Sequence, residues 1–161
     1  RSHVSYANCG LPYYVGGVIA EEDKLYLQTP ESLHNRFRLD VRVHHEVTEI
    51  AADKKVVIAR DLISGKESEI SFDKLILSPG ASPVVPPIPG IERALTLRTV
   101  EDVLRIYDAV EVKPKNAVVI GGGFIGVEMA ENLVHKGIKT SLIEALPQVL
   151  APLDQIGRAH V

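Results

Sequence analysis

The chain has a single cysteine, Cys9, no tryptophan, and aromatic residues at only 5% of its 161 positions. One cysteine forms no disulfide within the chain, which favours a reducing, cytoplasmic setting. No apolar run approaches the roughly 20 residues that cross a bilayer, and no basic-then-apolar signal pattern opens the sequence. We therefore expect a cytoplasmic protein without a membrane partner.

Strong charge of either sign is also lacking, because the formal net charge is −3 and the isoelectric point is near 6.1. This balance argues against nucleic acid as a partner. His44 and His45 do not predict a metal site, since adjacent strand residues point to opposite faces and no Cys or His stands at zinc-ligand spacing. The 45% hydrophobic content predicts a globular protein with a core.

The last six residues, IGRAHV at 156–161, break the pattern before them. Back-translated, they spell a common short-read sequencing adapter. We therefore interpret them as a non-native tail and the chain as a fragment truncated at both ends. Source nucleotides with other codons at these positions would refute this interpretation.

The first half of the chain predicts short elements and one linker. TPESLHNRF predicts a helix over 30–37, with Thr29 as its cap and Pro30 in the first position. The segment 10–28 has a mixed pattern, and Gly16 and Gly17 loosen its backbone. Strands are expected at Leu39–Val43, on both sides of a turn at Ser64–Gly65, and, as a buried strand, at Leu75–Leu77. Five prolines between residues 79 and 89 predict a domain boundary near residue 83.

The second half predicts a helix followed by a strand, a glycine turn, a helix and a strand. Thr99 and Asp102 have the spacing of a capping box for the first helix. In NAVVIGGGFIGVEMAENL, the glycines at 121, 123 and 126 form G-x-G-x-x-G between an apolar strand and a helix. That context is typical of dinucleotide-binding turns, in which backbone N–H groups at a helix N-terminus bind the pyrophosphate.

An acidic residue, Glu144, ends the next strand, 23 positions after Gly121 (144 minus 121). A carboxylate there binds a ribose 2′-hydroxyl and repels the 2′-phosphate of NADP, so NADH is favoured over NADPH. Glu128 is either a surface residue of the helix or a contact of the nicotinamide. The alternative for the whole pattern is a plain helix–strand packing turn.

Cys9 permits three interpretations: an inert buried thiol, half of a disulfide with a partner outside the chain, or a nucleophile. Its neighbours favour a site, because Asn8 can hydrogen-bond a ligand, Pro12 fixes the turn, and Tyr13 and Tyr14 offer hydroxyl groups and flat faces. N–H groups at a turn or helix start would activate such a thiol.

Several blocks taken together, SYANCGLPYYVGG, TPESLHNRF, FDKLILSPGASP and VVIGGGFIGVEMAENL, resemble the coenzyme A-disulfide reductase group of the FAD-dependent pyridine nucleotide-disulfide oxidoreductases. The similarity runs from about Ser5 to Asp154. It implies an α/β fold with two Rossmann-like FAD- and NAD(P)-binding domains, truncated at both ends. Residues 3–83 would be part of the FAD domain, without its first FAD motif, and residues 84–155 the start of the NAD domain.

The resemblance implies that NADH reduces FAD, which then reduces a mixed disulfide between Cys9 and coenzyme A. The substrate would be coenzyme A disulfide, or a persulfide or polysulfide, and the full-length protein would be a homodimer. The fragment alone would be inactive. Catalysis is assigned to Cys9, coenzyme A binding to Ser5, Asn8 and Arg36, and FAD binding to Val47, Ser78, Pro79, Gly80 and Ala81. NAD binding is assigned to Ile120, Gly121, Gly122, Gly123, Phe124, Ile125, Gly126, Glu128 and Glu144.

One departure weakens the substrate assignment. Some members of the group carry a basic residue directly after the arginine that matches Arg36, whereas here Phe37 follows and Arg38 comes next. A solvated helix end explains Arg36 and Arg38 equally well. Two other functions remain open: an NADH oxidase or peroxidase in which Cys9 cycles through a sulfenic acid, and a non-catalytic nucleotide-binding module in which Cys9 is structural.

Overall fold

The computed structural model describes residues 2–153, so the predicted tail at 156–161 lies outside the described residues. The chain divides into two compact units. One unit runs up to Tyr6 and continues over Tyr26–Ser82, and the other joins Ala7–Leu25 to the chain from Pro83 onward. The segment that carries Cys9 therefore folds with the second half of the chain.

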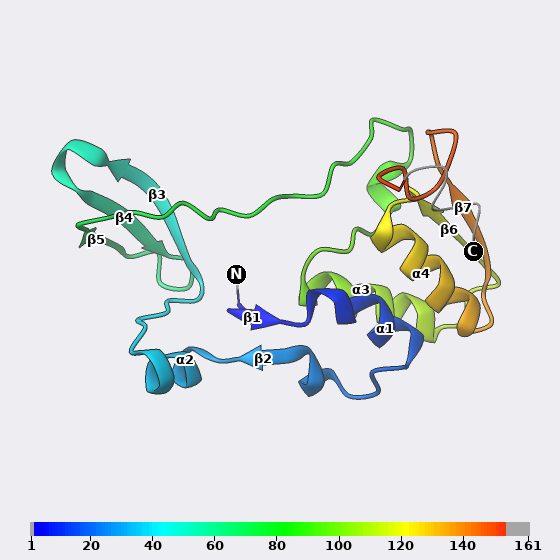
Figure 1. Cartoon of the computed structure of the whole chain (residues 1–161), viewed down its shortest axis with the longest axis horizontal. Helices are drawn as coiled ribbons and strands as arrows, with labels where there is room; N and C mark the ends of the chain where they lie inside the picture. The colour runs from blue at the N-terminus through cyan, green and yellow to red at the C-terminus, as the bar shows by residue number, and fades with distance from the viewer. Residues whose placement is uncertain (1, 154–161) are drawn as a thin grey trace. The chain divides into compact units, whose positions relative to one another are not determined.

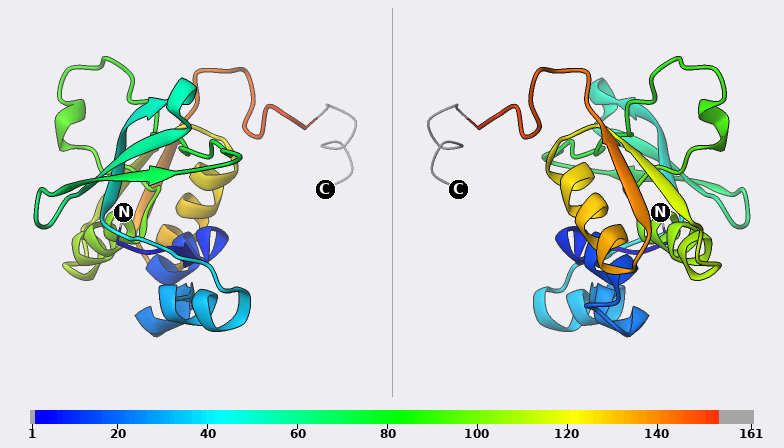
Figure 2. Two further views of the ribbon diagram at one scale, coloured as in Figure 1. Left: turned by 90° about the vertical axis from the view of Figure 1, so that its left-hand side faces the viewer. Right: turned by 90° about the vertical axis from the view of Figure 1, so that its right-hand side faces the viewer.

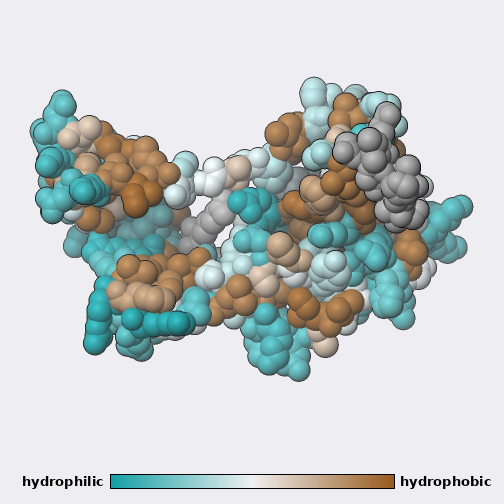
Figure 3. Space-filling model, in the orientation of Figure 1, coloured by the Kyte–Doolittle hydropathy of each residue, from teal (hydrophilic) through white to brown (hydrophobic). Residues whose placement is uncertain are grey.

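The first unit is built from short strands and one helix (Figure 1). β1 (Ser5–Tyr6) pairs antiparallel with β2 (Tyr26–Gln28), and α2 (Pro30–Phe37) follows. An antiparallel sheet in the order β3-β4-β5 is formed by β3 (His45–Ala51), β4 (Val56–Asp61) and β5 (Glu67–Ser71), with a 3-10 turn, η3, at Ala52–Lys54. Apolar side chains remain visible on this sheet (Figure 3), because only Val57 and Ala59 of its residues are buried.

Two predictions for this unit are confirmed by local hydrogen bonds. The Thr29 hydroxyl accepts from the Ser32 backbone N–H at 3.2 Å, and the Ser32 hydroxyl accepts from the Thr29 N–H at 3.0 Å, which starts α2 at Pro30. The β4–β5 turn contains Ser64 and Gly65 as predicted, and the Asp61 carboxylate accepts from the Ile63 N–H at 2.8 Å.

Two predicted strands are wrong. Residues 39–43 are not a strand, because Asp40 binds Arg42 and His44 adopts a left-handed φ of 57°, so β3 begins only at His45. Residues 75–77 have no regular secondary structure and are exposed, with Ile76 88% accessible. An apolar strand needs a ladder partner, and no strand within residues 2–153 pairs with this segment.

The second unit contains three helices around a parallel pair of strands. Its elements are η1 (Asn8–Gly10), α1 (Leu11–Gly16), η2 (Glu22–Leu25), η4 (Ile91–Arg93), α3 (Val100–Glu111), β6 (Asn116–Ile120), α4 (Phe124–His135) and β7 (Lys139–Ile143). α4 lies along β6 and β7 (Figure 2), and α1 contacts both α3 and α4. The main buried apolar side chains are Leu11, Val15, Leu25, Val100, Val103, Met129, Leu133 and Ile138.

α1 is the element that sequence patterns do not predict. It is only six residues long and contains Pro12 in its first turn and Gly16 at its end. Helices this short gain little from intrinsic propensity and depend on tertiary packing. Here Leu11 and Val15 are almost fully buried, and Gly17 ends the helix at a left-handed φ of 81°.

α3 begins with the predicted capping box. The Thr99 hydroxyl accepts from the Asp102 N–H at 3.2 Å, and the Asp102 carboxylate accepts from the N–H groups of Thr99 at 2.9 Å and Arg98 at 3.1 Å. Burial acts to raise the pKa of Asp102, but the hydrogen bonds from Thr99, Arg105 and Arg98 outweigh it, so the pKa is lowered.

The Asp102 cap predicts a pH-dependent contribution to stability. We expect Asp102→Ala to lower the free energy of unfolding of the second unit at pH 7 by about 1 kcal/mol. Because the pKa of Asp102 is lower in the folded than in the unfolded state, this contribution is full above the unfolded pKa, about 4, and is lost as the pH falls through the folded pKa. Urea denaturation at several pH values measures the difference. Asp108→Ala, an exposed aspartate of the same helix, is the control and should change little; an equal loss in both variants would contradict the cap.

Candidate functional site

The glycine turn joins β6 to α4. The Gly121 N–H donates to the Ile143 carbonyl of β7 at 2.8 Å, and Gly121 takes a positive φ of 103° that an L side chain rarely adopts. α4 then begins at Phe124 with Gly123 as its cap, and within residues 2–153 no side-chain cap hydrogen bond is formed at this helix start. These N–H groups and the positive end of the helix dipole suit an anionic ligand.

Gly126 allows the closest approach in this turn. A Cβ at residue 126 would lie 1.8 Å from the Gly121 carbonyl oxygen, which is impossible without moving the backbone. At Gly121 and Gly123 a Cβ would meet nothing within 4 Å, so this side of the turn is open. The three glycines thus have the separate roles that a dinucleotide turn requires: a tight turn, an open approach and close helix packing.

The remaining residues assigned to NAD lie on the same turn and helix. Ile120 ends β6, and Phe124, Ile125 and Glu128 occupy the first turns of α4. Phe124 and Ile125 are more than half exposed, whereas Met129 and Leu133 are buried. Glu128 is half-buried, and its backbone carbonyl accepts a hydrogen bond from the Asn132 amide.

Glu144 directly follows β7 and reaches back to the glycine turn. One carboxylate oxygen accepts from the Leu146 N–H at 2.8 Å, and the other accepts from the Gly122 N–H at 2.5 Å. These bonds, first that from Leu146 and then that from Gly122, lower the pKa of Glu144. The carboxylate is therefore an anion at neutral pH, held beside the turn. The Leu150 N–H also donates to the Gly122 carbonyl at 2.7 Å.

Cys9 lies in the 3-10 turn η1, immediately before α1, and is exposed. The turn is held at its base by the Ala7 N–H, which donates to the Leu25 carbonyl at 2.8 Å. Asn8 is also exposed, and its side-chain oxygen accepts from the Arg98 guanidinium at 3.5 Å. Of the three interpretations of Cys9, that of a buried thiol disagrees with this exposure.

The two tyrosines after Cys9 have different surroundings. Tyr14 is 7% exposed and packs on Tyr107 of α3, with ring centroids 4.9 Å apart. Burial, followed by the charges of Glu22 and Asp108 and by Tyr107, raises the pKa of Tyr14. Tyr14 therefore contributes to helix packing, whereas Tyr13 is half-buried.

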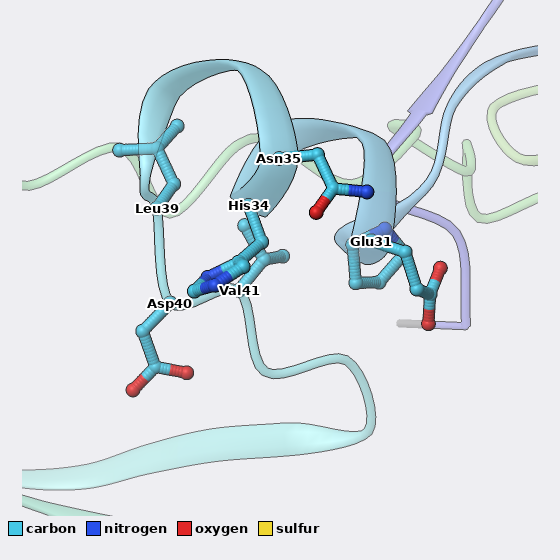
Figure 4. Close-up of a pocket in the computed structure, with 7 residues that line it drawn as sticks. Glu31, His34, Asn35, Leu39, Asp40 and Val41 are labelled. Carbon is cyan, nitrogen blue, oxygen red and sulfur yellow. The ribbon is translucent and has the colours of Figure 1, made fainter.

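The residues assigned to coenzyme A lie in different units. Ser5 belongs to β1 of the first unit, and Asn8 belongs to the second. Arg36 is exposed on α2, with its guanidinium 5.0 Å from the centre of the Phe37 ring. An open groove of about 380 Å³ lies beside α2 (Figure 4), lined by Pro30, Glu31, His34, Asn35, Leu39, Asp40 and Val41.

This groove does not suit the phosphates of coenzyme A. It contains two carboxylates, those of Glu31 and Asp40. Hydrogen bonds from its own backbone N–H and from Thr29 lower the pKa of Glu31, and hydrogen bonding with Arg42 lowers the pKa of Asp40. Both groups are negative at neutral pH and repel an anionic ligand. Arg36 does not line the groove.

The residues assigned to FAD lie in the first unit. Val47 is 54% exposed on β3, and Ser78–Ala81 form an exposed segment in which Gly80 has a φ of 78°. This open backbone can be covered by a large ligand, but these residues alone do not enclose one.

Two sequence expectations concern absences within residues 2–153. No group of three or more His, Cys, Asp or Glu residues there is arranged to hold a metal ion. No helix in that range is both long and apolar enough to cross a membrane.

Sequence reasoning missed two residues of the second unit. Arg98 contacts Asn8 across 90 positions, and nothing in the sequence indicates that pairing. Asn132 is 3% exposed and is the one polar side chain among the buried residues of the described chain. Its position between Met129 and Leu133 on an otherwise apolar helix face was the available signal.

Curated relatives are similar over most of this chain. An NADH oxidase from Enterococcus faecalis is 35% identical, over 93% of this chain and 34% of its own length. A coenzyme A disulfide reductase from Staphylococcus epidermidis is 33% identical, over 94% of this chain and 35% of its own length. The chain therefore spans about a third of the length of the curated relatives it matches.

Solved structures share the fold. The reduced CoADR-RHD protein of Bacillus anthracis is 50% identical with a TM-score of 0.89, covering 94% of this chain and 28% of that one. An NAD-dependent persulfide reductase from A. fulgidus is 37% identical with a TM-score of 0.88, covering 96% of this chain and 29% of that one. A water-forming NADH oxidase from Lactobacillus brevis, bound to NADH, is 31% identical with a TM-score of 0.82, covering 91% of this chain and 32% of that one.

The glycine turn predicts that two alanine substitutions differ strongly in their effect on stability. Gly126→Ala forces a methyl group against the Gly121 carbonyl and should lower the free energy of unfolding of the second unit by about 2 kcal/mol or more. Gly123→Ala, the matched control, adds the same methyl group where nothing lies within 4 Å and should change it little. Thermal and urea denaturation measure both. Equal stability of the two variants would contradict the close approach.

The comparisons also settle the family. Residues 1–161 match the family described as pyridine nucleotide-disulphide oxidoreductase, whose members bind FAD and NAD(P)H. The α/β, Rossmann-like fold class and the resemblance to coenzyme A-disulfide reductases are confirmed by the relatives and the solved structures. The chain belongs to the pyridine nucleotide-disulphide oxidoreductase family.

Proposed function

We propose that this chain carries the reactive cysteine and the NADH-binding turn of an enzyme that reduces coenzyme A disulfide, or a related persulfide or polysulfide. One observation carries the proposal: the only thiol of the chain is exposed, and it lies in the same compact unit as the glycine turn. The activity belongs to a protein of about the relatives' length, which we expect to be a cytoplasmic homodimer, and the chain alone is expected to be inactive.

The chemistry of the thiol can be written with its atoms balanced. The Cys9 thiolate attacks one sulfur of the disulfide, forms Cys9–S–S–CoA, and releases one coenzyme A thiolate, which takes up a proton. NADH and FAD, when bound, supply the two electrons that reduce this mixed disulfide. The hydride that NADH gives up provides these two electrons and the one proton that the step needs, so Cys9 is restored as a thiolate, the second coenzyme A leaves as a thiol, and NADH becomes NAD⁺.

Three further residues have proposed roles in binding the substrate. Asn8 and Ser5 orient the substrate, and Arg36 contributes positive charge to coenzyme A binding. Within this chain Cys9 has no second thiol to pair with, so the proposal takes its disulfide partner from the substrate. The exposure of Cys9 allows a bulky disulfide to approach.

The residues of this chain support NADH binding more fully than FAD binding. The open side of the turn at Gly121 and Gly123, together with the helix N-terminus behind it, fits a pyrophosphate. Val47 and Ser78–Ala81 are proposed to contact FAD, with the remainder of that site supplied by the longer protein.

Glu144 supports NADH rather than NADPH. Its carboxylate is held at the glycine turn and its pKa is lowered, so it is negative at the pH of the reaction. A 2′-phosphate placed near it would be repelled, whereas a ribose hydroxyl can donate to it.

A second candidate function is an NADH oxidase or peroxidase, which the 35% identity to the Enterococcus faecalis relative favours. In that chemistry Cys9 would be oxidised by a peroxide to a sulfenic acid and then reduced with electrons from NADH, releasing water. A non-catalytic nucleotide-binding module is the third possibility, and the exposed thiol argues against it.

Trapping at Cys9 distinguishes these functions. The full-length, FAD-loaded protein that contains this chain is incubated with coenzyme A disulfide, and the Cys9 peptide is analysed by mass spectrometry. We expect a coenzyme A adduct that NADH releases and NADPH releases far more slowly. Cys9→Ser should carry no adduct and should lose disulfide-dependent NADH oxidation.

Other outcomes would contradict the proposal. A dimedone adduct at Cys9 after peroxide treatment, without any coenzyme A adduct, would favour the oxidase or peroxidase. Unchanged NADH turnover in Cys9→Ser, with no adduct of either kind, would leave only the non-catalytic module.

A further inference from the structure

Gly16 and Asn132 form an unusually close contact between two helices. Gly16 is the last residue of α1, and Asn132 lies in the last turns of α4. A Cβ at residue 16 would lie 2.0 Å from the Asn132 side-chain oxygen and 2.8 Å from its amide carbon. The carboxamide thus occupies the space that any other side chain at residue 16 would need.

The Asn132 side chain is fixed from the other side. Its nitrogen donates to the Glu128 carbonyl at 2.8 Å, one turn earlier in α4, and the residue is 3% exposed. The carboxamide is therefore fixed by its own helix on one side and faces Gly16 of α1 on the other.

We call the contact between Gly16 and Asn132 the joint, and a second set of contacts surrounds it. Tyr14 of α1 packs on Tyr107 of α3, and the Lys136 ammonium lies 5.5 Å from the centre of the Tyr107 ring. Lys136 also pairs with Glu111 at 2.9 Å. α1, which follows Cys9 directly, is therefore held against both α3 and α4 by contacts at its C-terminal half.

Each of the two helices in the joint follows a turn with a proposed role. Cys9 lies in η1, just before α1, and the glycine turn ends at the start of α4. A displacement of α1 on α4 moves Cys9 relative to the glycine turn, because a short helix moves as one body. Reaction rates are sensitive to such shifts, since a misplacement of about 1 Å can cost a factor of about 100.

We propose that Asn132 is a positioning residue: its contact with Gly16 holds the Cys9 turn in place relative to the dinucleotide turn, and passage of electrons from NADH to Cys9 depends on it. This inference rests on the proposed function. It assigns a role to two residues that touch neither substrate nor cofactor in that proposal.

The test uses the full-length, FAD-loaded protein with four variants. Gly16→Ala inserts a methyl group into the joint, and Asn132→Ala removes the carboxamide. The double variant carries both substitutions. Glu131→Ala is the matched control, because it shortens an exposed polar side chain on the same helix. The readouts are kcat and KM for NADH in disulfide reduction, and the unfolding temperature of each variant.

We expect Gly16→Ala to lower kcat about tenfold or more while KM for NADH changes less than about threefold, because the glycine turn itself is untouched. The double variant should be no slower than Asn132→Ala, since the added methyl group fills the space that the carboxamide leaves. The unfolding temperature should show the same non-additivity. Glu131→Ala should match the wild type in every readout.

Three results would overturn the inference. Gly16→Ala could keep the wild-type kcat while its unfolding temperature falls, which would make the contact purely structural. The losses in the two single variants could simply add in the double variant, which would deny a shared joint. Glu131→Ala could lose as much as Asn132→Ala, which would make the effect general to α4. Failure of the wild-type protein to reduce coenzyme A disulfide would instead overturn the proposed function.

Discussion

The second unit depends on one steric constraint, the absence of a side chain at Gly126. Because the Gly121 carbonyl oxygen occupies the space of a Cβ, α4 begins directly against the end of β6. That start leaves the first N–H groups of α4 available and brings β7 alongside, so that Glu144 reaches the Gly122 N–H. The same helix then offers Met129, Asn132 and Leu133 to the core, where α1 docks.

Features that are local in sequence could be predicted. The capping box of Thr99 with Asp102 and the cap at Thr29 require residues only three positions apart, and both are present. The strand, glycine turn, helix and strand of residues 116–145 also follow from local spacing and apolar periodicity. For the same reason the turn and Glu144 could be paired in advance, since two adjacent parallel strands end at one edge of a sheet.

Features that depend on partners far away in the sequence could not be predicted. The apolar residues 75–77 have strand composition, but no neighbouring strand within residues 2–153 accepts their hydrogen bonds. α1 was missed because its proline and glycines argue against a helix, while its Leu11 and Val15 are buried and the helix contacts α3 and α4, over 80 residues away. The Arg98 contact to Asn8 and the burial of Tyr14 have the same origin. The grouping of Cys9 with the glycine turn is therefore a tertiary property.

That grouping is the central claim, and hydrogen exchange at backbone amides tests it most directly. If α1 is an integral part of the second unit, its amides and those of α3 and α4 open together, with the same free energy and the same dependence on denaturant. We expect this common opening, distinct from that of the β3-β4-β5 sheet. Exchange of the α1 amides at a low free energy of their own, or together with that sheet, would contradict the account.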